Sequence, residues 1–424
     1  MRVAHRGKRF GLTGPHSGPL DIKKTRFHMQ KNLPLIVLTL LVIPFTTFAD
    51  EIHFTLREPY GIMRHGIPVG ELVTLPAAVP EGTSFRLVRD GKPVRAQFRN
   101  ATPGQESDKW WLDFAGVLDP FETAAFTIQY GPDTQPGPER ERGHVLSEKE
   151  DAYTIANAPY IEWKVPRNLS GLLASVSYPP LEHLQPAEGL LLRDAQGNQH
   201  RMGGPGTNSR VLRQGPMAVG LRFEKTETAP ELAGVSWTVD LIFPARVSWM
   251  EVDVRVDDPQ QHVAALGWQL HLNLDPPTAK EPTLVDFGAS RTVYGSLRPE
   301  WQMELRARPS LEIPWQVWRG KAGELRLMEA APLKSAALAE GWAHVMDRRR
   351  CLALAVSEFS KQGDEQLTID ADGMLTAWRT FAAEVGQEKT MRSWFHFVTF
   401  PHQLGAATSP QSMQNPPVVR WGQP

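Results

Sequence analysis

The sequence predicts an all-β protein built from antiparallel sheets, and three observations support this prediction. The 424 residues include 36 prolines and 34 glycines, as expected for many short strands joined by turns. The 13 tryptophans are typical of sandwiches that bury large rings between two sheets. Residues 351–356 form a continuous apolar run of strand length, and residues 394–400 are rich in aromatics. Both runs have the pattern of strands buried on both faces.

The composition is that of a globular protein of two or so domains: 41% of the residues are hydrophobic, 22% are charged and the formal net charge is -1. A nucleic-acid binder needs a positively charged face, so this balance argues against nucleic acid as a partner. The basic triplet 348–350 has the pattern of a charge cluster at a strand edge. Cys351 is the one cysteine of the chain, which excludes an internal disulfide, and we expect a buried, inert thiol.

Residues 1–49 are expected to be an N-terminal extension and a signal peptide. Basic Lys31 precedes an apolar run of about 13 residues, and Thr47-Phe48-Ala49 has the small-x-small pattern of a cleavage site after Ala49. The run is shorter than the roughly 20 apolar residues that cross a bilayer, so we predict a secreted or periplasmic protein without membrane attachment after cleavage. Translation starts at Met1, with a long basic region, or at Met29, which begins a complete signal peptide by itself. Both interpretations stay open.

Residues 50–131 are predicted to form a small β domain. Its short strands are expected at residues 85–88, 94–98, 110–114 and 125–130. A turn at Arg89-Asp90-Gly91-Lys92 joins the first two strands. Residues 132–143 are rich in proline, glycine and charge, which predicts a linker between domains.

Residues 144–403 are predicted to form a larger β domain. Alternation is clear at residues 248–256, where Glu251, Asp253 and Arg255 share one face and apolar residues the other. Later in the domain, Asp372-Gly373 is the turn of a hairpin. Further strands are expected at residues 153–155, 161–165, 189–193, 217–224, 236–243, 266–274, 366–369 and 374–378.

Helical signals are few. Residues 332–340 have a helix-forming composition and a proline at a plausible first position, so one short helix is expected there. Residues 404–424 are rich in proline, glutamine and serine and are expected to form a flexible tail, within which residues 418–421 could dock.

A polar strand face is the best candidate for a binding site. In residues 266–274, Gln269, His271 and Asn273 alternate with leucines and therefore lie side by side on one face. A sheet face with amide, imidazole, guanidinium and indole groups can hold a saccharide, because rings stack on sugars and polar groups bond their hydroxyls and carboxylates. A solvated outer sheet face is the alternative, and both interpretations stay open.

Arg291 and Tyr294 are candidates for β-elimination of an acidic sugar, the arginine as carboxylate clamp and the tyrosine as proton acceptor. With His271 they form the predicted catalytic set. Three tryptophans in a proline-punctuated region are predicted to bind substrate, namely Trp301, Trp315 and Trp318. Structural packing is the alternative for each of these residues. No metal-ligand spacing is present, no cofactor is indicated, and no pattern supports a calcium site.

Ordered motifs at both ends of residues 50–403 resemble the exo-rhamnogalacturonan lyase family and its YetA-like relatives. The motifs are residues 66–70 (GIPVG), 90–99 (DGKPVRAQFR), 109–114 (KWWLDF), 341–359, 371–379 (ADGMLTAWR) and 386–390 (GQEKT). The resemblance implies a RIFT-barrel-like first domain and a central β super-sandwich. It also implies a C-terminal α/α toroid, for which this chain has no helical segment. Cys351 stands where the family has a glycine, and Trp378-Arg379 where it has Trp-Pro.

The resemblance and the signal peptide predict an exported protein that binds, or helps to process, an acidic polysaccharide of the rhamnogalacturonan or pectin type. If the family's cleft lies between sandwich and toroid, half of it is missing, so the chain alone is not expected to be a complete lyase. A separate catalytic toroid protein is then a candidate partner. An active polysaccharide lyase and a non-catalytic structural or interaction protein of the cell envelope are the alternatives.

Overall fold

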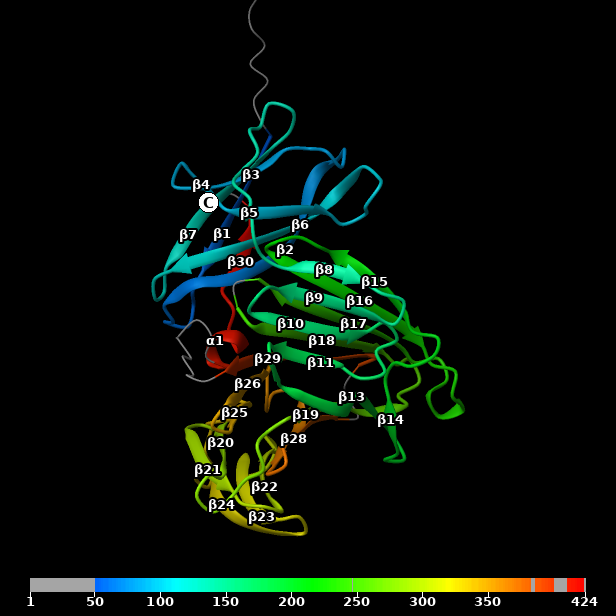
Figure 1. Cartoon of the computed structure of the whole chain (residues 1–424), viewed down its shortest axis with the longest axis vertical. Helices are drawn as coiled ribbons and strands as arrows, with labels where there is room; N and C mark the ends of the chain where they lie inside the picture. The colour runs from blue at the N-terminus through cyan, green and yellow to red at the C-terminus, as the bar shows by residue number, and fades with distance from the viewer. Residues whose placement is uncertain (1–49, 246, 383–385, 400–409, 423–424) are drawn as a thin grey trace, which may run out of the picture. The chain divides into compact units, whose positions relative to one another are not determined.

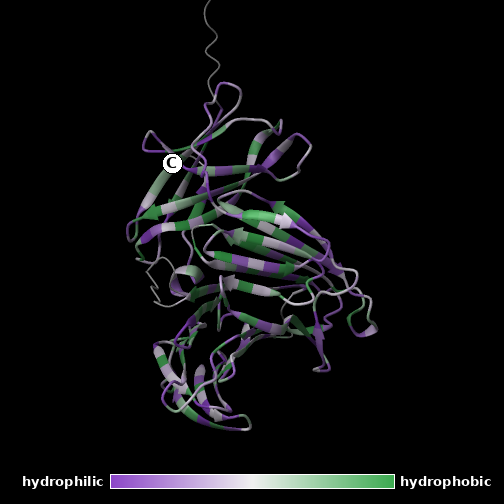
Figure 2. Ribbon diagram, viewed as in Figure 1, coloured by the Kyte–Doolittle hydropathy of each residue, from purple (hydrophilic) through white to green (hydrophobic). Residues whose placement is uncertain are grey.

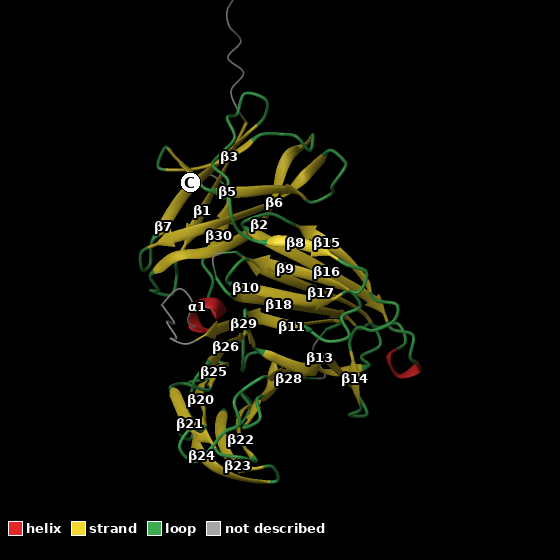
Figure 3. Cartoon of the chain, viewed as in Figure 1, coloured by secondary structure: helices red, strands yellow, loops and turns green. Residues whose placement is uncertain are grey.

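The computed structural model describes residues 50–245, 247–382, 386–399 and 410–422 (Figure 1). Within these ranges the chain forms five antiparallel sheets, one short α-helix and one turn of 3-10 helix (Pro230–Leu232), which confirms the all-β prediction (Figure 3). The predicted signal peptide and its cleavage site lie outside the described residues. No helix in the described part of the chain is long and apolar enough to cross a bilayer.

Two sheets build the first domain around a common core. Phe54, Phe114 and Phe126 meet there with ring centroids 5.1–6.1 Å apart. The five-stranded sheet has the order β30-β1-β7-β3-β4, and the three-stranded sheet has the order β2-β6-β5. Their strands are β1 (Asp50–Arg57), β2 (Arg64–Val79), β3 (Phe85–Arg89), β4 (Lys92–Val94), β5 (Ala96–Asn100), β6 (Ser107–Leu118), β7 (Thr123–Tyr130) and β30 (Val418–Trp421).

The end of the described chain is built into this domain. β30 pairs antiparallel with β1, with Phe54 opposite Trp421, and the two rings lie 5.0 Å apart. The helix α1 (Pro410–Gln414) precedes β30, and Arg64 donates to the carbonyl of Ser412 at 2.9 Å. The prediction of a flexible tail is therefore wrong for residues 410–422, whereas the expectation that residues 418–421 could dock is confirmed. Pairing with β30 satisfies the backbone groups that β1 would otherwise expose at a sheet edge.

Three sheets build the larger domain. Their orders are β12-β11-β10-β9-β8, β14-β13-β19-β28-β27-β22-β23-β24 and β15-β16-β17-β18-β29-β26-β25-β20-β21, called here the five-, eight- and nine-stranded sheets of the sandwich. The first half of the strands is β8 (Val145–Glu148), β9 (Ala152–Asn157), β10 (Ile161–Pro166), β11 (Ser175–Tyr178), β12 (Leu181–Glu182), β13 (Leu184–Asp194), β14 (Gln199–Arg201), β15 (Asn208–Arg213), β16 (Ala218–Thr226), β17 (Ser236–Pro244) and β18 (Trp249–Asp257). The second half is β19 (Val263–Leu272), β20 (Thr283–Gly288), β21 (Thr292–Leu297), β22 (Trp301–Ala307), β23 (Trp315–Lys321), β24 (Glu324–Ala330), β25 (Trp342–Met346), β26 (Arg350–Val356), β27 (Gly363–Asp370), β28 (Met374–Phe381) and β29 (Glu388–Thr399).

The inner face of the nine-stranded sheet packs on both other sheets of the sandwich. The ring centroids of Trp163 in the five-stranded sheet and Phe243 in the nine-stranded sheet lie 5.5 Å apart. Those of Trp268 in the eight-stranded sheet and Phe395 in the nine-stranded sheet lie 4.8 Å apart. Figure 2 shows polar and apolar residues alternating along these strands, as sheets with one buried face require. The core of the sandwich therefore lies between the nine-stranded sheet and the other two.

β26 is buried along its whole length. Its inner residues join the sandwich core, while Ala353 and Ala355 pack into the core of the first domain with Trp394. This confirms the predicted burial of residues 351–356 on both faces. Burial raises the pKa of Cys351 to about 12, as expected for an inert thiol.

The helix predicted at residues 332–340 does not form. The segment begins with a turn in which Ser335 N–H donates to the Pro332 carbonyl, and Lys334 N–H donates to Glu312, outside the segment. Ala331 and Ala339 are buried at its two ends. Contacts with the sandwich thus replace the hydrogen bonds that a local helix would make, so tertiary structure overrides the helix propensity of the sequence.

Candidate functional site

A hollow of about 700 Å³ lies between β2 and β6 of the first domain and the outer face of the nine-stranded sheet. Alternation along β16, β17, β18 and β29 turns their polar residues to this face. Register places Arg222, Asp240, Asp253 and Arg392 in one row across the four strands. The sequence prediction that Glu251, Asp253 and Arg255 share a face is confirmed.

Ion pairs order this row of charges. Arg222 holds Asp240 with two hydrogen bonds of 2.7 Å, a bidentate geometry that fixes both side chains. Arg255 reaches the same carboxylate at 2.5 Å, and Arg392 donates to Asp253 at 3.1 Å. The floor of the hollow is thus a network of side chains held before any ligand arrives.

A further ion pair closes the hollow against the first domain. Arg213 of β15 lies 3.1 Å from Asp113 of β6, with both side chains 4% exposed, and its guanidinium stacks 4.3 Å from the Trp111 ring. Gly70 faces this pair, because a Cβ there would lie 2.7 Å from Arg213 Nη2. Burial raises the pKa of Asp113, and the charge of Arg213 lowers it in part. Glycine at position 70 is therefore explained by the space that the ion pair occupies.

Gln97 of β5 connects the two domains beside this pair. Its amide nitrogen lies 3.3 Å from Asp113 Oδ2 and 3.3 Å from the Ala218 carbonyl, and its amide oxygen accepts the Met217 N–H at 2.9 Å. Gly70, Gln97 and Asp113 each belong to one of the three N-terminal sequence motifs described above. The motifs thus converge on the junction that forms the hollow.

Glu71 and Glu251 are the carboxylates of the hollow best suited to proton transfer. Burial raises the pKa of both, and the charges of Arg213 and Arg392 lower it in part. Glu251 accepts the Trp394 Nε1–H at 3.0 Å and pairs with Arg392 at 3.4 Å. Among the described residues, no hydrogen bond or ion pair engages the Glu71 carboxylate. Glu71 is therefore free to accept or donate a proton.

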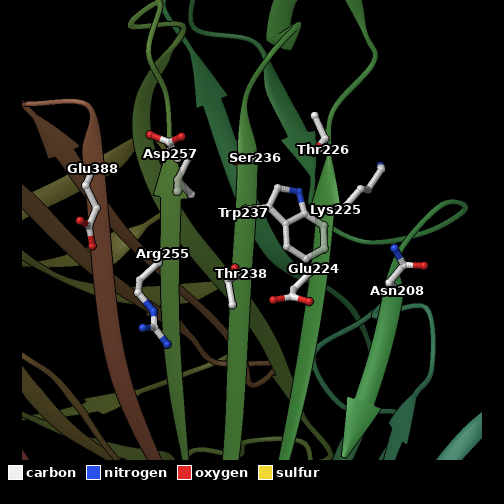
Figure 4. Close-up of a pocket in the computed structure, with 11 residues that line it drawn as sticks. Asn208, Glu224, Lys225, Thr226, Ser236, Trp237, Thr238, Arg255, Asp257 and Glu388 are labelled. Carbon is white, nitrogen blue, oxygen red and sulfur yellow. The ribbon is translucent and has the colours of Figure 1, made fainter. Parts of the chain in front are cut away.

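A second hollow, of about 350 Å³, continues along the same sheet face (Figure 4). Arg255 lines both hollows. The second hollow is lined from neighbouring strands of the nine-stranded sheet, and Figure 4 shows among its side chains Asn208, Glu224, Thr238, Asp257 and Glu388. We call the two hollows together the sheet groove.

The predicted polar face of β19 exists in the eight-stranded sheet. Gln269 and His271 point away from the buried Trp268, Leu270 and Leu272, which confirms their shared face. Contacts from the sheet occupy their polar atoms: Gln269 accepts a backbone N–H at 3.3 Å, and His271 lies 3.2 Å from the Asp372 carbonyl. Just beyond the strand, Asn273 accepts from Gln185 at 3.3 Å.

Arg291 and Tyr294 lie elsewhere, at the edge of the nine-stranded sheet. Arg291 precedes β21 and forms an ion pair with Glu329, while Tyr294 is 70% exposed on β21. No contact or hollow found among the described residues joins either residue to His271. The structure therefore does not assemble the three predicted catalytic residues into one site.

The three predicted tryptophans differ in exposure. Trp315 is 1% exposed and belongs to the sandwich core, so its prediction as a substrate-binding ring is wrong. Trp301 and Trp318 are half-buried. The guanidinium carbon of Arg319 lies 5.5 Å from the centroid of the Trp301 ring, and that of Arg306 lies 5.2 Å from the centroid of the Trp318 ring. Only these two rings retain a surface that a ligand can reach.

Residues that the sequence did not single out as functional dominate the sheet groove, among them Glu71, Arg213 and Arg392. The alternation around Glu251 was a usable signal for the sandwich side. On the first-domain side the N-terminal motifs include Gly70 and Asp113, but only tertiary packing brings β2 and β6 over that face. The described residues contain no group of three or more His, Cys, Asp or Glu side chains that could hold a metal ion.

A scan against protein-family models and a search of curated proteins each found no match. Among solved structures, an α-mannosidase from Enterococcus faecalis V583 is similar with a TM-score of 0.52 and 10% identity, over 88% of this chain and 46% of that one. A protein in glycosyl hydrolase family 38 from Enterococcus faecalis gives a TM-score of 0.49 at 10% identity, over 88% and 47%. A galactose mutarotase-like protein from Lactobacillus casei ATCC 334 gives 0.33 at 13% identity, over 60% and 100%. The chain spans about half the length of the first two proteins, and at this identity the likeness concerns the fold alone.

Proposed function

We propose that this protein is exported and binds an acidic polysaccharide of the rhamnogalacturonan or pectin type along the sheet groove. The observation that supports this most is the charge of the larger hollow, which is lined by six cationic and five carboxylate side chains. Burial raises the pKa of three of those carboxylates, those of Glu71, Asp113 and Glu251. Protonation of Glu71 or Glu251 adds to the excess of cationic over carboxylate side chains, and arginine recognises carboxylates well.

The shape of the groove favours a chain over a small metabolite. The two hollows share Arg255 and follow neighbouring strands, so successive sugar units would meet charged and polar side chains in turn. Thr238 and Asn208 supply hydrogen-bonding groups for hydroxyls in the smaller hollow. The fold likeness to an α-mannosidase supports a carbohydrate ligand by analogy only.

Help in processing the bound polysaccharide would come from Glu71. An unpaired carboxyl group with a raised pKa, beside arginines that stabilise developing negative charge, is suited to general acid or base catalysis. This role differs from the sequence-based hypothesis, which made Tyr294 the proton acceptor.

Affinity electrophoresis of the purified protein through gels containing polygalacturonate, rhamnogalacturonan or neutral mannan tests the binding. We expect retardation by the two acidic polymers and little by mannan. Arg210→Ala should weaken retardation. Arg210 lines the groove and is 52% exposed, and its ion pair with Glu224 is long, with Nε 3.8 Å from one carboxylate oxygen. Arg201→Ala is the matched control, because Arg201 is 51% exposed on β14, away from the groove. Equal retardation by mannan, or none by any polymer, overturns the proposal.

Two further measurements separate the alternatives. The purified protein is incubated with rhamnogalacturonan or pectin, without any added protein partner. Ultraviolet absorbance of unsaturated uronate that appears under these conditions and is abolished in Glu71→Gln would indicate an active lyase. Co-purification of a protein partner without binding to any glycan would instead indicate a structural role at the cell envelope. Export is tested by sequencing the N-terminus of the mature protein, where we expect Asp50.

A further inference from the structure

We propose a second saccharide site on the outer face of the eight-stranded sheet, centred on Arg193 and Trp378, that binds the carboxylate of a uronate sugar. A hollow of about 380 Å³ lies there, on strands that take no part in the sheet groove. Its lining also includes Arg308, Gln366 and Thr380. The site is independent of the proposed groove and shares with it only the class of ligand.

The strands hold the Trp378 ring flat against the sheet. Register places Trp378 of β28 opposite Gly267 of β19, and a Cβ on Gly267 would lie 2.6 Å from the indole Cε3 atom. The absent side chain lets the ring lie on the backbone of β19, with Leu191 and Ala265 in the same small apolar cluster. Trp378 is 8% exposed as a result, so its position is fixed from below.

Arg193 lies over this ring with its guanidinium carbon 4.1 Å from the ring centroid. Stacking on an aromatic face fixes the plane of a guanidinium group and leaves its N–H donors directed outward. Among the described residues, no hydrogen bond or ion pair engages those donors. A cation held rigidly and without a carboxylate partner, at the wall of a hollow, is prepared for a bidentate hydrogen bond with a carboxylate ligand.

The rest of the lining fits a sugar that carries such a carboxylate. Arg308 lies 3.9 Å from Asp364, with both side chains more than half exposed, so it is only loosely held and can turn to a ligand. Gln366 and Thr380 offer amide and hydroxyl groups for sugar hydroxyls. The negative charge of Glu304 is offset by Arg306, whose guanidinium donates two hydrogen bonds to the carboxylate. Glu304 therefore repels an anionic ligand only weakly.

The position in the sheet favours a saccharide over an acidic peptide. A peptide that adds to a sheet needs an unpaired strand edge. The strands beneath the hollow are β13, β19, β28, β27 and β22, and each is paired on both sides. The ligand must therefore bind through side chains alone, as a monosaccharide or disaccharide unit can.

Isothermal titration with a galacturonic acid dimer tests the proposal. Wild-type protein should bind two dimers per chain, one in the sheet groove and one at Arg193. Arg193→Ala should lose the second binding event, with affinity there falling by about tenfold or more. The affinity of Arg193→Lys at this site should lie between those of wild type and Arg193→Ala. Lysine keeps the positive charge but lacks the planar guanidinium group that forms two parallel hydrogen bonds. Arg201→Ala on the neighbouring β14 should match wild type.

The groove variant Arg210→Ala separates the two sites. In Arg210→Ala, the dimer should still bind at Arg193 with the same affinity as in wild type. This expectation holds even if the sheet groove of the wild-type protein binds no dimer. Unchanged stoichiometry and affinity in Arg193→Ala would overturn the second site, as would equal binding of a neutral galactose dimer. Equal binding of a short glutamate peptide would overturn the assignment to a saccharide.

Discussion

Arg379 and Glu365 form an ion pair inside the sandwich, with Nε and Oε1 2.5 Å apart and both side chains 1% exposed. Arg379 also donates to the Thr390 carbonyl at 3.1 Å and to Gln362 at 3.2 Å. It thereby connects the eight-stranded sheet, which contains β27 and β28, with β29 of the nine-stranded sheet. Position 379 is one of the places where the sequence departs from the lyase-like pattern, and the structure gives the arginine there a role between two sheets.

Replacing Arg379 with alanine should lower the free energy of unfolding by about 3–5 kcal/mol at pH 8, because it leaves the Glu365 carboxylate buried without its partner. Chemical denaturation followed by tryptophan fluorescence measures this. The double variant Arg379→Met with Glu365→Leu should recover most of the loss, since neither charge then remains. A single variant as stable as wild type would show that the pair contributes nothing.

Glu365 should also make stability depend on pH near neutrality. Burial raises the pKa of Glu365 to about 7, and the charge of Arg379 lowers it in part. The folded protein therefore holds this proton more tightly than the unfolded chain, whose ordinary value is 4.5. The contribution to stability is complete below pH 4.5 and is lost as the pH rises through about 7. Unfolding of wild type and Glu365→Gln across this range should show wild type losing stability relative to the variant, and parallel curves would contradict the shift.

The junction between the two domains should depend on Gln97. Its replacement by alanine leaves the Met217 N–H without its hydrogen-bond acceptor, at a cost of about 1–3 kcal/mol. Native-state hydrogen exchange should show faster exchange at the Met217 amide, together with a lower melting temperature. Gln129→Ala is the control, because Gln129 makes one exposed hydrogen bond, to Glu51. Equal effects of the two replacements would argue against Gln97 as the connection between the domains.

Binding of polygalacturonate in the sheet groove should strengthen as the pH falls from neutral to mildly acidic values. Burial raises the pKa of Glu71 and Glu251, so these groups take up protons while the sugar carboxylates stay ionised. Each proton removes a negative charge that repels the ligand. Affinity measured against pH tests this, and Glu71→Gln should bind more tightly than wild type at neutral pH with a flatter profile. A profile that is unchanged in the variant would exclude Glu71 from the binding surface.

Short-range periodicity was enough to predict several features. Alternation along β18 put Glu251, Asp253 and Arg255 on one face, and the unbroken apolar run of β26 predicted burial on both sides. Alternation on β19 likewise predicted the common face of Gln269 and His271. These predictions hold because the side-chain period of two is a property of the strand backbone itself, and one buried face imposes it on the sequence.

Only the tertiary structure decided which faces meet. Asp113 pairs with Arg213 across a hundred residues of chain, and Glu71 lines the same hollow as Arg392, through the packing of β2 and β6 over the nine-stranded sheet. The docking of β30 on β1 and the loss of the helix at residues 332–340 likewise depend on partners outside the local segment. A local pattern records the environment of a strand face, whereas the identity of its neighbour depends on the pairing order of the sheets, which no single strand encodes. The sequence by itself therefore determined the all-β class and the polar faces, and tertiary packing decided which of those faces became a groove.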